Sequence, residues 1–332
     1  MGLGLGRRGM MVMAGALAAC ARNPGVAEEI DVAAVAEMAR RPEDYVNGEA
    51  RAFSVSRDGR PAGLLWGTWH VGYDEATVMP RAIRRWFGAA SSLSVEVVLD
   101  RVPPPVRRAM AVVTARGLYR ADPGAVARLD RETRRSLAAA GLPSESFERY
   151  SLVGLTQLVS ARATAAPAGV LPQVGFVDLN LIGFARSIDV PVRGLEKADP
   201  ALLELLRYAD PNGEGAAAML RFALRRVPGA PELVTWLRRR YAAGAIGLMA
   251  AGLSAWRAEA VDLARADRDR GMLLTARNVA WMAGLEETLA EPGVAFVAFG
   301  AAHLTGADGI VALLRERGWD VAACVGDRCS MG

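Results

Sequence analysis

The chain contains only two histidines, and each lies three residues after a glycine, as Gly67 with His70 and Gly300 with His303. Imidazole is the side chain whose proton or lone pair is most available near neutral pH, so two imidazoles at one place favour a metal site or an acid–base site. The glycines suit a close approach of the backbone. We therefore expect His70 and His303 to lie together, whereas two unrelated structural histidines are the alternative.

Both histidines follow short apolar runs, residues 62–69 and 294–299, which predict β-strands. Ligands in an open α/β sheet bind beyond the carboxyl ends of the strands. A third strand is predicted at residues 92–99, with Glu96 inside an apolar run. Because an isolated buried carboxylate is costly, we expect Glu96 near the strand end beside a cation, unless it lies on the solvated face of an edge strand. Asp100 ends the same run and is a substitute.

Four further residues are candidates, Arg277 as a catalytic group and Asp178, Glu196 and Asn278 as supporting groups. Asp178 begins an apolar helix, where a capping role explains it equally well. Glu196 follows a strand predicted at residues 190–194, and a surface salt bridge is its alternative. Arg277, with Asn278 beside it, suits a substrate carboxylate or an active-site carboxylate held in bidentate fashion, but the chain is rich in arginines that merely face solvent.

The other elements are read from apolar periodicity and turn residues. Near the start, residues 52–56 predict a strand, 57–60 a hairpin turn and 78–88 a helix. The middle is mostly helical, with helices expected at 105–117, 124–129, 131–140, 151–163 and 174–188 and about four more within 200–289. The chain closes with a helix at 306–317 and a strand at 319–324.

These elements predict an α/β fold whose central sheet is built from both ends of the chain. The α/β domain is expected at residues 51–323, with a large helical insertion at about 104–290.

The N-terminus resembles a bacterial lipoprotein signal peptide. Arg7 and Arg8 precede an apolar run at residues 10–17, too short to span a bilayer, and Cys20 follows in a sequence that resembles a lipobox. We expect cleavage after residue 19, lipidation of Cys20 and a tether with a short helix up to residue 50. The following Ala21, in place of Asp, favours the outer membrane of a diderm envelope. The alternative is an ordinary secretory signal, and both predict export to the periplasmic face of the envelope.

Cysteine usage agrees with export. Cys324 and Cys329 remain after Cys20 and predict a local disulfide in a tail at residues 324–332, because a metal clip would need two more ligands. A loop this small stabilises by only about 2 kcal/mol.

Charge and composition exclude some classes of protein. Hydrophobic residues make up 52% of the 332 residues, so we expect a sizeable core and not a disordered chain. The formal net charge is +4, but removing Arg7 and Arg8 leaves 38 basic against 36 acidic residues, and Lys197 is the only lysine. There is no basic stripe interleaved with aromatics, so nucleic acid is not an expected partner. The oligomeric state is not indicated.

The segments around both histidines, residues 64–72 and 300–306, resemble the two signatures of the TraB/GumN family, which includes PrgY-type proteins and the Tiki metalloproteases. The resemblance covers about residues 53–321, and Glu96, Asp178, Glu196, Arg277 and Asn278 fall in the expected order between the signatures. It implies the fold of erythromycin esterases and ChaN-like proteins, an α/β core with helical additions.

For activity, the resemblance to Tiki proteins implies metal-dependent peptide cleavage with His70, Glu96 and His303 as ligands of manganese or cobalt. The leading hypothesis is thus a lipid-anchored metal-dependent hydrolase of peptides or proteins in the cell envelope. One alternative is an esterase-like hydrolase without metal, in which a histidine acts as general base. Another is an envelope protein that binds a peptide or haem-like ligand without turnover.

Overall fold

The computed structural model describes residues 45–69, 79–98, 102–119, 121–163, 177–200, 211–226, 230–258, 270–325 and 329. The predicted signal peptide, Cys20 and the tether up to residue 44 lie outside these ranges, as do His70 and Asp100.

The centre of the protein is a six-stranded sheet in the order β4-β3-β5-β2-β1-β6. Its strands are β1 (Ala52–Arg57), β2 (Arg60–Thr68), β3 (Ser92–Val95), β4 (Val192–Gly194), β5 (Ala295–Gly300) and β6 (Asp320–Ala323). The strands β4, β3, β5 and β2 are parallel neighbours, whereas β1 pairs antiparallel with both β2 and β6. Four adjacent strands therefore present their carboxyl ends along the same edge, and this edge carries the site described below.

The predicted hairpin turn joins β1 to β2. Asp58 and Gly59 both have positive φ, 53° and 73°, and Arg57 pairs with Arg60. Two central residues with positive φ are typical of the type I′ turn, whose twist matches that of the flanking strands. The turn thus sets the register between β1 and β2, and β2 in turn pairs with β5 so that Gly67 and Thr68 lie beside the end of β5.

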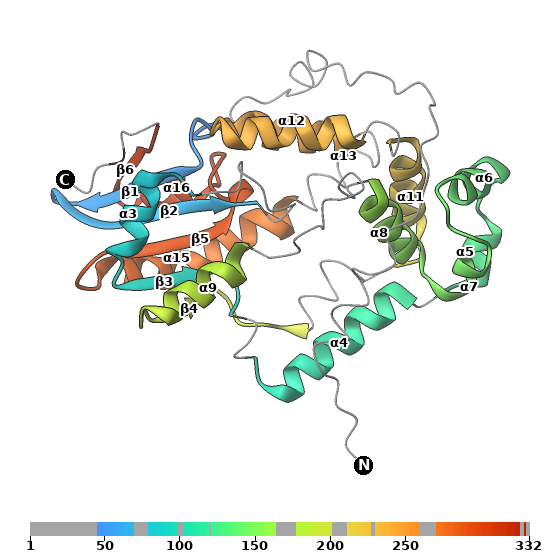
Figure 1. Cartoon of the computed structure of the whole chain (residues 1–332), viewed down its shortest axis with the longest axis horizontal. Coiled ribbons are helices and arrows are strands. Elements are labelled where there is room, and N and C mark those ends of the chain that lie inside the picture. Colours follow the sequence, from blue (N-terminus) through green and yellow to red (C-terminus); the bar gives the residue numbers. More distant parts are fainter. Residues whose placement is uncertain are drawn as a thin grey trace.

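The central strand β5 is buried on both faces, which explains its continuous apolar sequence. Phe296 and Ala298 enter the core beneath α3 (Arg81–Gly88) and α9 (Val177–Ser187). Val297 and Phe299 enter the opposite core, beneath α15 (Ala276–Ala290) and α16 (Ile310–Glu316). The sheet is accordingly the middle layer between two layers of helices (Figure 1).

A helical lobe lies to one side of the sheet (Figure 1). It contains α4 (Pro104–Tyr119), α5 (Pro123–Ala127), α6 (Arg131–Ala139), α7 (Glu145–Arg149), α8 (Leu152–Ala163) and α11 (Glu214–Arg226). Its own core includes Leu137, Leu155 and Leu220, all fully buried. Two further helices, α12 (Ala230–Ala242) and α13 (Ile246–Ala258), pack through Tyr241 and Ile246 against Ala301, just beyond β5.

The structure confirms an α/β fold with a large helical insertion. Three details differ from the expectation. The strand predicted at residues 190–194 is present as β4, but it joins the central sheet, so the sheet is not built only from the two ends of the chain. The helix α15, also from within the predicted insertion, covers one face of this sheet. The strand β3 ends at Val95, so Glu96 follows the strand instead of lying inside it. A short helix, α7, was not predicted.

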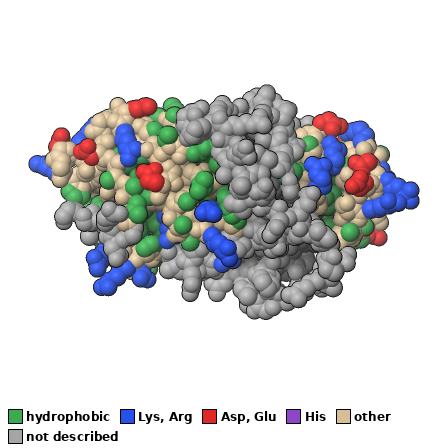
Figure 2. Space-filling model, turned by 90° about the horizontal axis from the view of Figure 1, so that it is seen from above, with side chains coloured by type: hydrophobic (Ala, Val, Ile, Leu, Met, Phe, Trp, Pro, Cys, Tyr) green, Lys and Arg blue, Asp and Glu red, His purple; other side chains and the backbone are tan. Residues whose placement is uncertain are grey.

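The surface agrees with the balanced charge of the chain. On the face in Figure 2, the described arginines stand singly or in small groups among acidic and hydrophobic side chains. None of the helices in the described ranges is long and apolar enough to cross a membrane.

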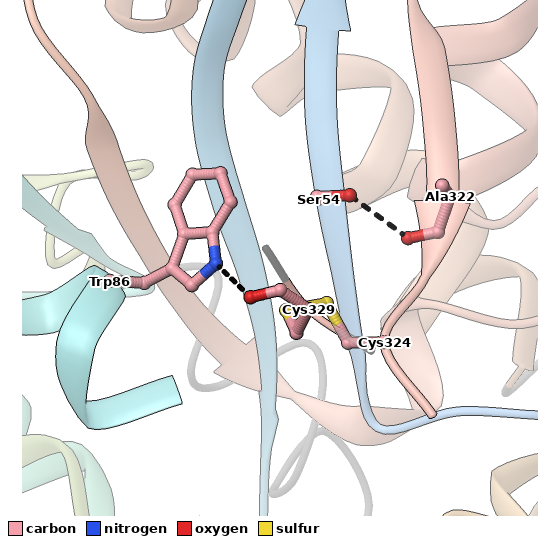
Figure 3. The surroundings of a disulfide bond; sticks show 5 residues. All are labelled: Ser54, Trp86, Ala322, Cys324 and Cys329. Atoms are coloured by element: carbon pink, nitrogen blue, oxygen red, sulfur yellow. Dashed lines mark hydrogen bonds between the residues drawn. A yellow bond between two sulfur atoms is a disulfide. The ribbon is translucent and has the colours of Figure 1, made fainter. Parts of the chain in front are cut away.

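At the C-terminus, Cys324 and Cys329 form a disulfide (Figure 3). The Cys324 amide extends the pairing of β6 with β1 by donating to the Ala52 carbonyl at 2.9 Å. The Trp86 indole on α3 donates to the Cys329 carbonyl at 3.0 Å. The chain is therefore attached to β1 at Cys324 and to α3 at Cys329.

Candidate functional site

The candidate site lies at the carboxyl ends of the parallel strands. Glu96 directly follows β3, Glu196 comes two residues after β4, and His303 ends the short 3-10 turn (Ala301–His303) after β5. The end of β2 leads through Trp69 toward His70, which lies outside the described residues. Arg277 and Asn278 reach this edge from the first turn of α15. Residues far apart in the sequence thus meet because parallel strands end together.

Glu96 is held by two donors. Its Oε1 accepts from the backbone N–H of Gly300 at 2.6 Å, and its Oε2 accepts from Nη2 of Arg277 at 2.6 Å. Nε2 of His303 is 3.9 Å from Oε1. The Glu96 side chain is 18% exposed, so it is partly screened from water but remains accessible.

Arg277 lies at the centre of the cluster, where it contacts the carboxylates of both Glu96 and Glu196. Its Nε and Nη2 donate to the two carboxylate oxygens of Glu196 at 3.0 and 2.7 Å, which is a bidentate ion pair. Nη2 also binds Glu96, as described above. The guanidinium lies over the Trp281 ring, 4.7 Å from its centre, and the indole N–H of Trp281 donates to Glu196 at 3.1 Å. Glu196 is therefore fixed from two sides.

The remaining nitrogen of Arg277 faces the interior of the cluster. Nη1 donates to the Leu273 carbonyl at 3.3 Å and lies 3.3 Å from Nε2 of His303. A guanidinium has five N–H donors. All five are used by these partners, so Arg277 positions the carboxylates and has no donor left for a substrate.

His303 is buried, and Asn278 orients its ring. Nδ2 of Asn278 donates to the Asp308 carbonyl at 2.8 Å, so the amide oxygen must be the atom that faces Nδ1 of His303, at 2.6 Å. An amide oxygen accepts, which means that Nδ1 carries the proton. Nε2 of the neutral ring then presents its lone pair toward Arg277 and Glu96. The Trp281 ring packs against the imidazole, with 4.5 Å between the ring centres.

The charges in the cluster stabilise one another. Burial alone would raise the pKa of the Glu96 carboxyl, but the positive charge that His303 carries whenever it is protonated, the Arg277 guanidinium and the Gly300 N–H outweigh burial and hold the pKa below its ordinary value. Burial lowers the pKa of Arg277, but its hydrogen bonds and ion pairs with Glu196 and Glu96 raise the pKa above the ordinary value. Glu96 is thus a carboxylate and Arg277 a cation at neutral pH.

The structure brings together Glu96, Glu196, Arg277, Asn278, Gly300 and His303, as described above. It places Asp178 as the second residue of α9, and its side chain is not described. His70 and Asp100 lie outside the described residues, so their predicted roles stay predictions.

The contacts around Gly67 show why the first signature has a glycine at this position. A Cβ at this position would lie 2.7 Å from the Leu304 side chain and 2.9 Å from the Ala301 backbone. Contacts this short would push the ends of β2 and β5 apart. The Gly67 carbonyl also accepts a hydrogen bond from the Tyr241 hydroxyl at 2.7 Å.

Sequence reasoning missed Trp281, Asp308 and Tyr241. Trp281 follows Arg277 by four residues on a helix, so the i, i+4 rule would have found it. No sequence signal marks Asp308 or Tyr241, because their contacts depend on how distant segments pack.

The partners of these side chains decide whether they can hold a metal ion. Among the described residues, no group of three or more His, Cys, Asp and Glu is placed to hold a metal ion. The two carboxylate oxygens of Glu96 accept hydrogen bonds from Arg277 and from the Gly300 N–H. The oxygens of Glu196 accept from Arg277 and Trp281. Nε2 of His303 lies beside Nη1 of Arg277. As arranged, these side chains do not fit a metal ion. The predicted ligand set also needs His70, so the metal site stays a prediction.

Comparison with known proteins agrees with the signatures. No curated protein and no solved structure matches this chain significantly. The model of the TraB/PrgY/gumN family matches residues 52–323, from the first residue of β1 to the last residue of β6. That range is most of the chain, and it includes every residue of the cluster. The chain therefore belongs to the TraB/PrgY/gumN family.

Proposed function

We propose that this protein is a hydrolase of acyl bonds, of the ester or peptide type, that works in the cell envelope. The observation that carries the proposal is the orientation of His303, whose Nδ1 proton is held by Asn278 so that its Nε2 lone pair faces Glu96. A base held by an orienting group and backed by a carboxylate is the arrangement that general base catalysis needs. The envelope location rests on the predicted signal peptide and lipid anchor at Cys20.

In the proposed reaction, Nε2 of His303 takes a proton from water while the water oxygen attacks the carbonyl carbon of the substrate. The imidazolium then returns the proton to the leaving amine or alcohol as the bond from the carbonyl carbon to the leaving group breaks. The Glu96 carboxylate, 3.9 Å from Nε2, stabilises the imidazolium. The Arg277 contact to Nε2, at 3.3 Å, is long for a hydrogen bond and so competes weakly with water.

The second candidate is the metal-dependent hydrolase, with His70, Glu96 and His303 as ligands. One observation favours it besides the family resemblance. A metal-bound histidine commonly donates its other N–H to an oxygen, as Nδ1 of His303 does to Asn278. A bound metal would polarise the carbonyl and acidify water. Nε2 of His303 and Oε2 of Glu96 would have to release Arg277 first.

The main test is hydrolysis by the untagged full-length protein of a library of esters and peptides, with and without a chelator. We expect His303→Ala and Glu96→Gln to abolish hydrolysis. The matched control is Glu286→Gln, a glutamate on the same helix as Arg277 that pairs with Arg317 and Trp319 away from the site. Full activity of His303→Ala would refute the proposal, and tight binding of one library member without turnover would favour a binding protein instead.

Metal titration separates the two hydrolase candidates. If Arg277 is the resident cation, the wild type binds Mn²⁺ or Co²⁺ weakly, and Arg277→Ala binds them more tightly because Glu96, Glu196 and His303 lose their internal partner. Stoichiometric, tight binding by the wild type that His70→Ala abolishes would support the metal-dependent candidate.

A further inference from the structure

We infer that Asp308 is a positioning residue for this site, because it maintains a widened helical turn. The shape of that turn places Arg277 and Asn278 in contact with Glu96 and His303. This inference rests on the proposed function only for its catalytic consequence. The positioning itself is argued from contacts and can be tested without any substrate.

The widened turn is a π-helix at Gly271–Thr275, immediately before α15. A π turn is rare and is found mostly as a single turn inserted in an α-helix, frequently at functional sites. Arg277 and Asn278 are the second and third residues of α15, so the widened turn directly precedes both residues that contact the site. Because such a turn is less favourable than an α-helical one, contacts outside the helix must maintain it.

Asp308 supplies those contacts. Its carboxylate accepts hydrogen bonds from Arg270 at 2.9 Å and from the hydroxyl of Thr275. These donors flank the π turn, one residue before it and at its last position. The Asp308 carbonyl accepts from Nδ2 of Asn278. One residue therefore clamps both ends of the turn and also anchors the amide that orients His303.

The backbone around Asp308 is itself held in place. A Cβ on the neighbouring Gly309 would lie 2.4 Å from the Thr305 carbonyl oxygen and 2.5 Å from that of Leu304. The amide of Gly309 donates to the Gly306 carbonyl at 3.1 Å. The segment after His303 is thus folded tightly on itself, so a change of the Asp308 side chain releases the π turn but leaves the backbone platform in place.

The π turn is connected to the catalytic groups through two sets of hydrogen bonds. The Leu273 carbonyl, inside the π turn, accepts from Nη1 of Arg277, and Arg277 holds Glu96. Asn278 holds Nδ1 of His303. The hydrogen bonds of Asp308 described above go to Arg270, Thr275 and Asn278 and not to Glu96 or the imidazole, so its effect on either passes through α15.

The test uses the small number of histidines. Full-length protein labelled with ¹⁵N-histidine has only two imidazoles, and the spectrum of His70→Gln assigns the ring signals of His303. Nitrogen shifts distinguish a protonated from an unprotonated ring nitrogen. In the wild type we expect His303 as a single species with the proton on Nδ1. In Asp308→Ala we expect loss of that single species and a mixture of both tautomers.

Two conservative variants separate positioning from general loss of fold. Asp308→Asn keeps an acceptor for Thr275 and should retain most of the single tautomer, whereas Thr275→Val removes one clamp and should weaken it. Glu286→Ala is the matched control, because Glu286 also ties α15 to the segment after His303, through Trp319 and Arg317. It should leave the His303 signals unchanged.

An unchanged His303 spectrum in folded Asp308→Ala and Thr275→Val would overturn the inference, whether or not the protein hydrolyses anything. With a substrate, kcat of Asp308→Ala should fall by up to about a hundredfold with little change in KM, since misplacement acts on the chemical step. Absence of hydrolysis by the wild type would reject the proposed function while the spectra still decide the positioning role.

Discussion

Arg277 is largely buried together with the two carboxylates that it binds. It neutralises two carboxylates that are each only 18% exposed, and its own side chain is 16% exposed. Removing one partner of a buried ion pair leaves the other charge unsatisfied, which is far more destabilising than the absence of the pair altogether. Arg277 is therefore as important to the stability of this edge of the sheet as to its chemistry.

The first prediction concerns this ion-pair network. Arg277→Met should lower the free energy of unfolding by about 3 kcal/mol, because Glu96 and Glu196 would be left without a counter-ion. Arg277→Lys should recover only part of the loss, since an ammonium lacks the bidentate fork. Chemical denaturation measures both.

The control is Arg193→Met, which breaks an exposed ion pair with Glu291 and should cost less than about 1 kcal/mol. If Arg193→Met and Arg277→Met lowered the free energy of unfolding equally, burial would not be what makes the Arg277 ion pairs important for stability.

The second prediction concerns acid pH. The pKa of Glu96 is lower in the folded protein than in the unfolded chain, so its ionised form stabilises the fold above the unfolded pKa. That contribution should be lost as the pH falls through the folded pKa. The difference in unfolding free energy between wild type and Glu96→Gln should be constant near neutral pH and shrink in acid. A difference in unfolding free energy that grows on acidification would show that folding raises the pKa of Glu96 instead of lowering it.

At the scale of the elements, the end of β2 depends on a helix from the insertion. The Tyr241 hydroxyl on α12 donates to the Gly67 carbonyl, and the Arg51 guanidinium lies 5.0 Å from the centres of both the Tyr241 and Trp66 rings. Burial lowers the pKa of Arg51 against the opposing influence of Tyr241. The insertion thus supports the first signature, just before His70.

The third prediction follows from this support. Tyr241→Phe keeps the ring but leaves the Gly67 carbonyl without its donor, which should cost about 1–3 kcal/mol of stability by denaturant unfolding. Tyr119→Phe is the control, because Tyr119 is 51% exposed and its change should be near zero. A stability of Tyr241→Phe equal to that of wild type would mean that the Gly67 carbonyl finds another donor.

At the scale of the whole molecule, the site and the C-terminal tail lie on opposite faces of the sheet. Trp281, which contacts the site, belongs to the core beneath α15, whereas Cys329 and Trp86 belong to the core beneath α3 and α9. The contacts found for Cys324 and Cys329, within the part of the tail that the structure describes, therefore tie the chain to β1 and α3 and not to the cluster.

The fourth prediction separates these two roles. Cys324→Ser with Cys329→Ser should lower the unfolding free energy by about 2 kcal/mol, the value for a small disulfide loop. The His303 ring signals should stay those of the wild type. A changed tautomer in this variant would reveal coupling across the sheet that the contacts do not indicate.

Much of the fold was predictable because it depends on local pattern. The Asp58-Gly59 turn, the apolar runs of β2 and β5 and the helical middle were read from turn residues and periodicity, and all are present. The strand β3 was predicted too long because residues beyond Val95 are also apolar, and only pairing with β4 and β5 decides where it ends.

The sequence by itself determined which residues were candidates. Two signatures with all the histidine, and a carboxylate after each of two further strands, were enough to indicate one edge of one sheet, because parallel strands place their carboxyl ends together. Only the tertiary structure decided how they are joined. In the folded protein, all five N–H donors of Arg277 have partners within the cluster or in the adjoining turn. Asn278 sets the tautomer of His303, and Asp308 binds the residues that flank the π turn. Those facts depend on hydrogen-bond geometry between segments up to 181 residues apart, which no local pattern encodes.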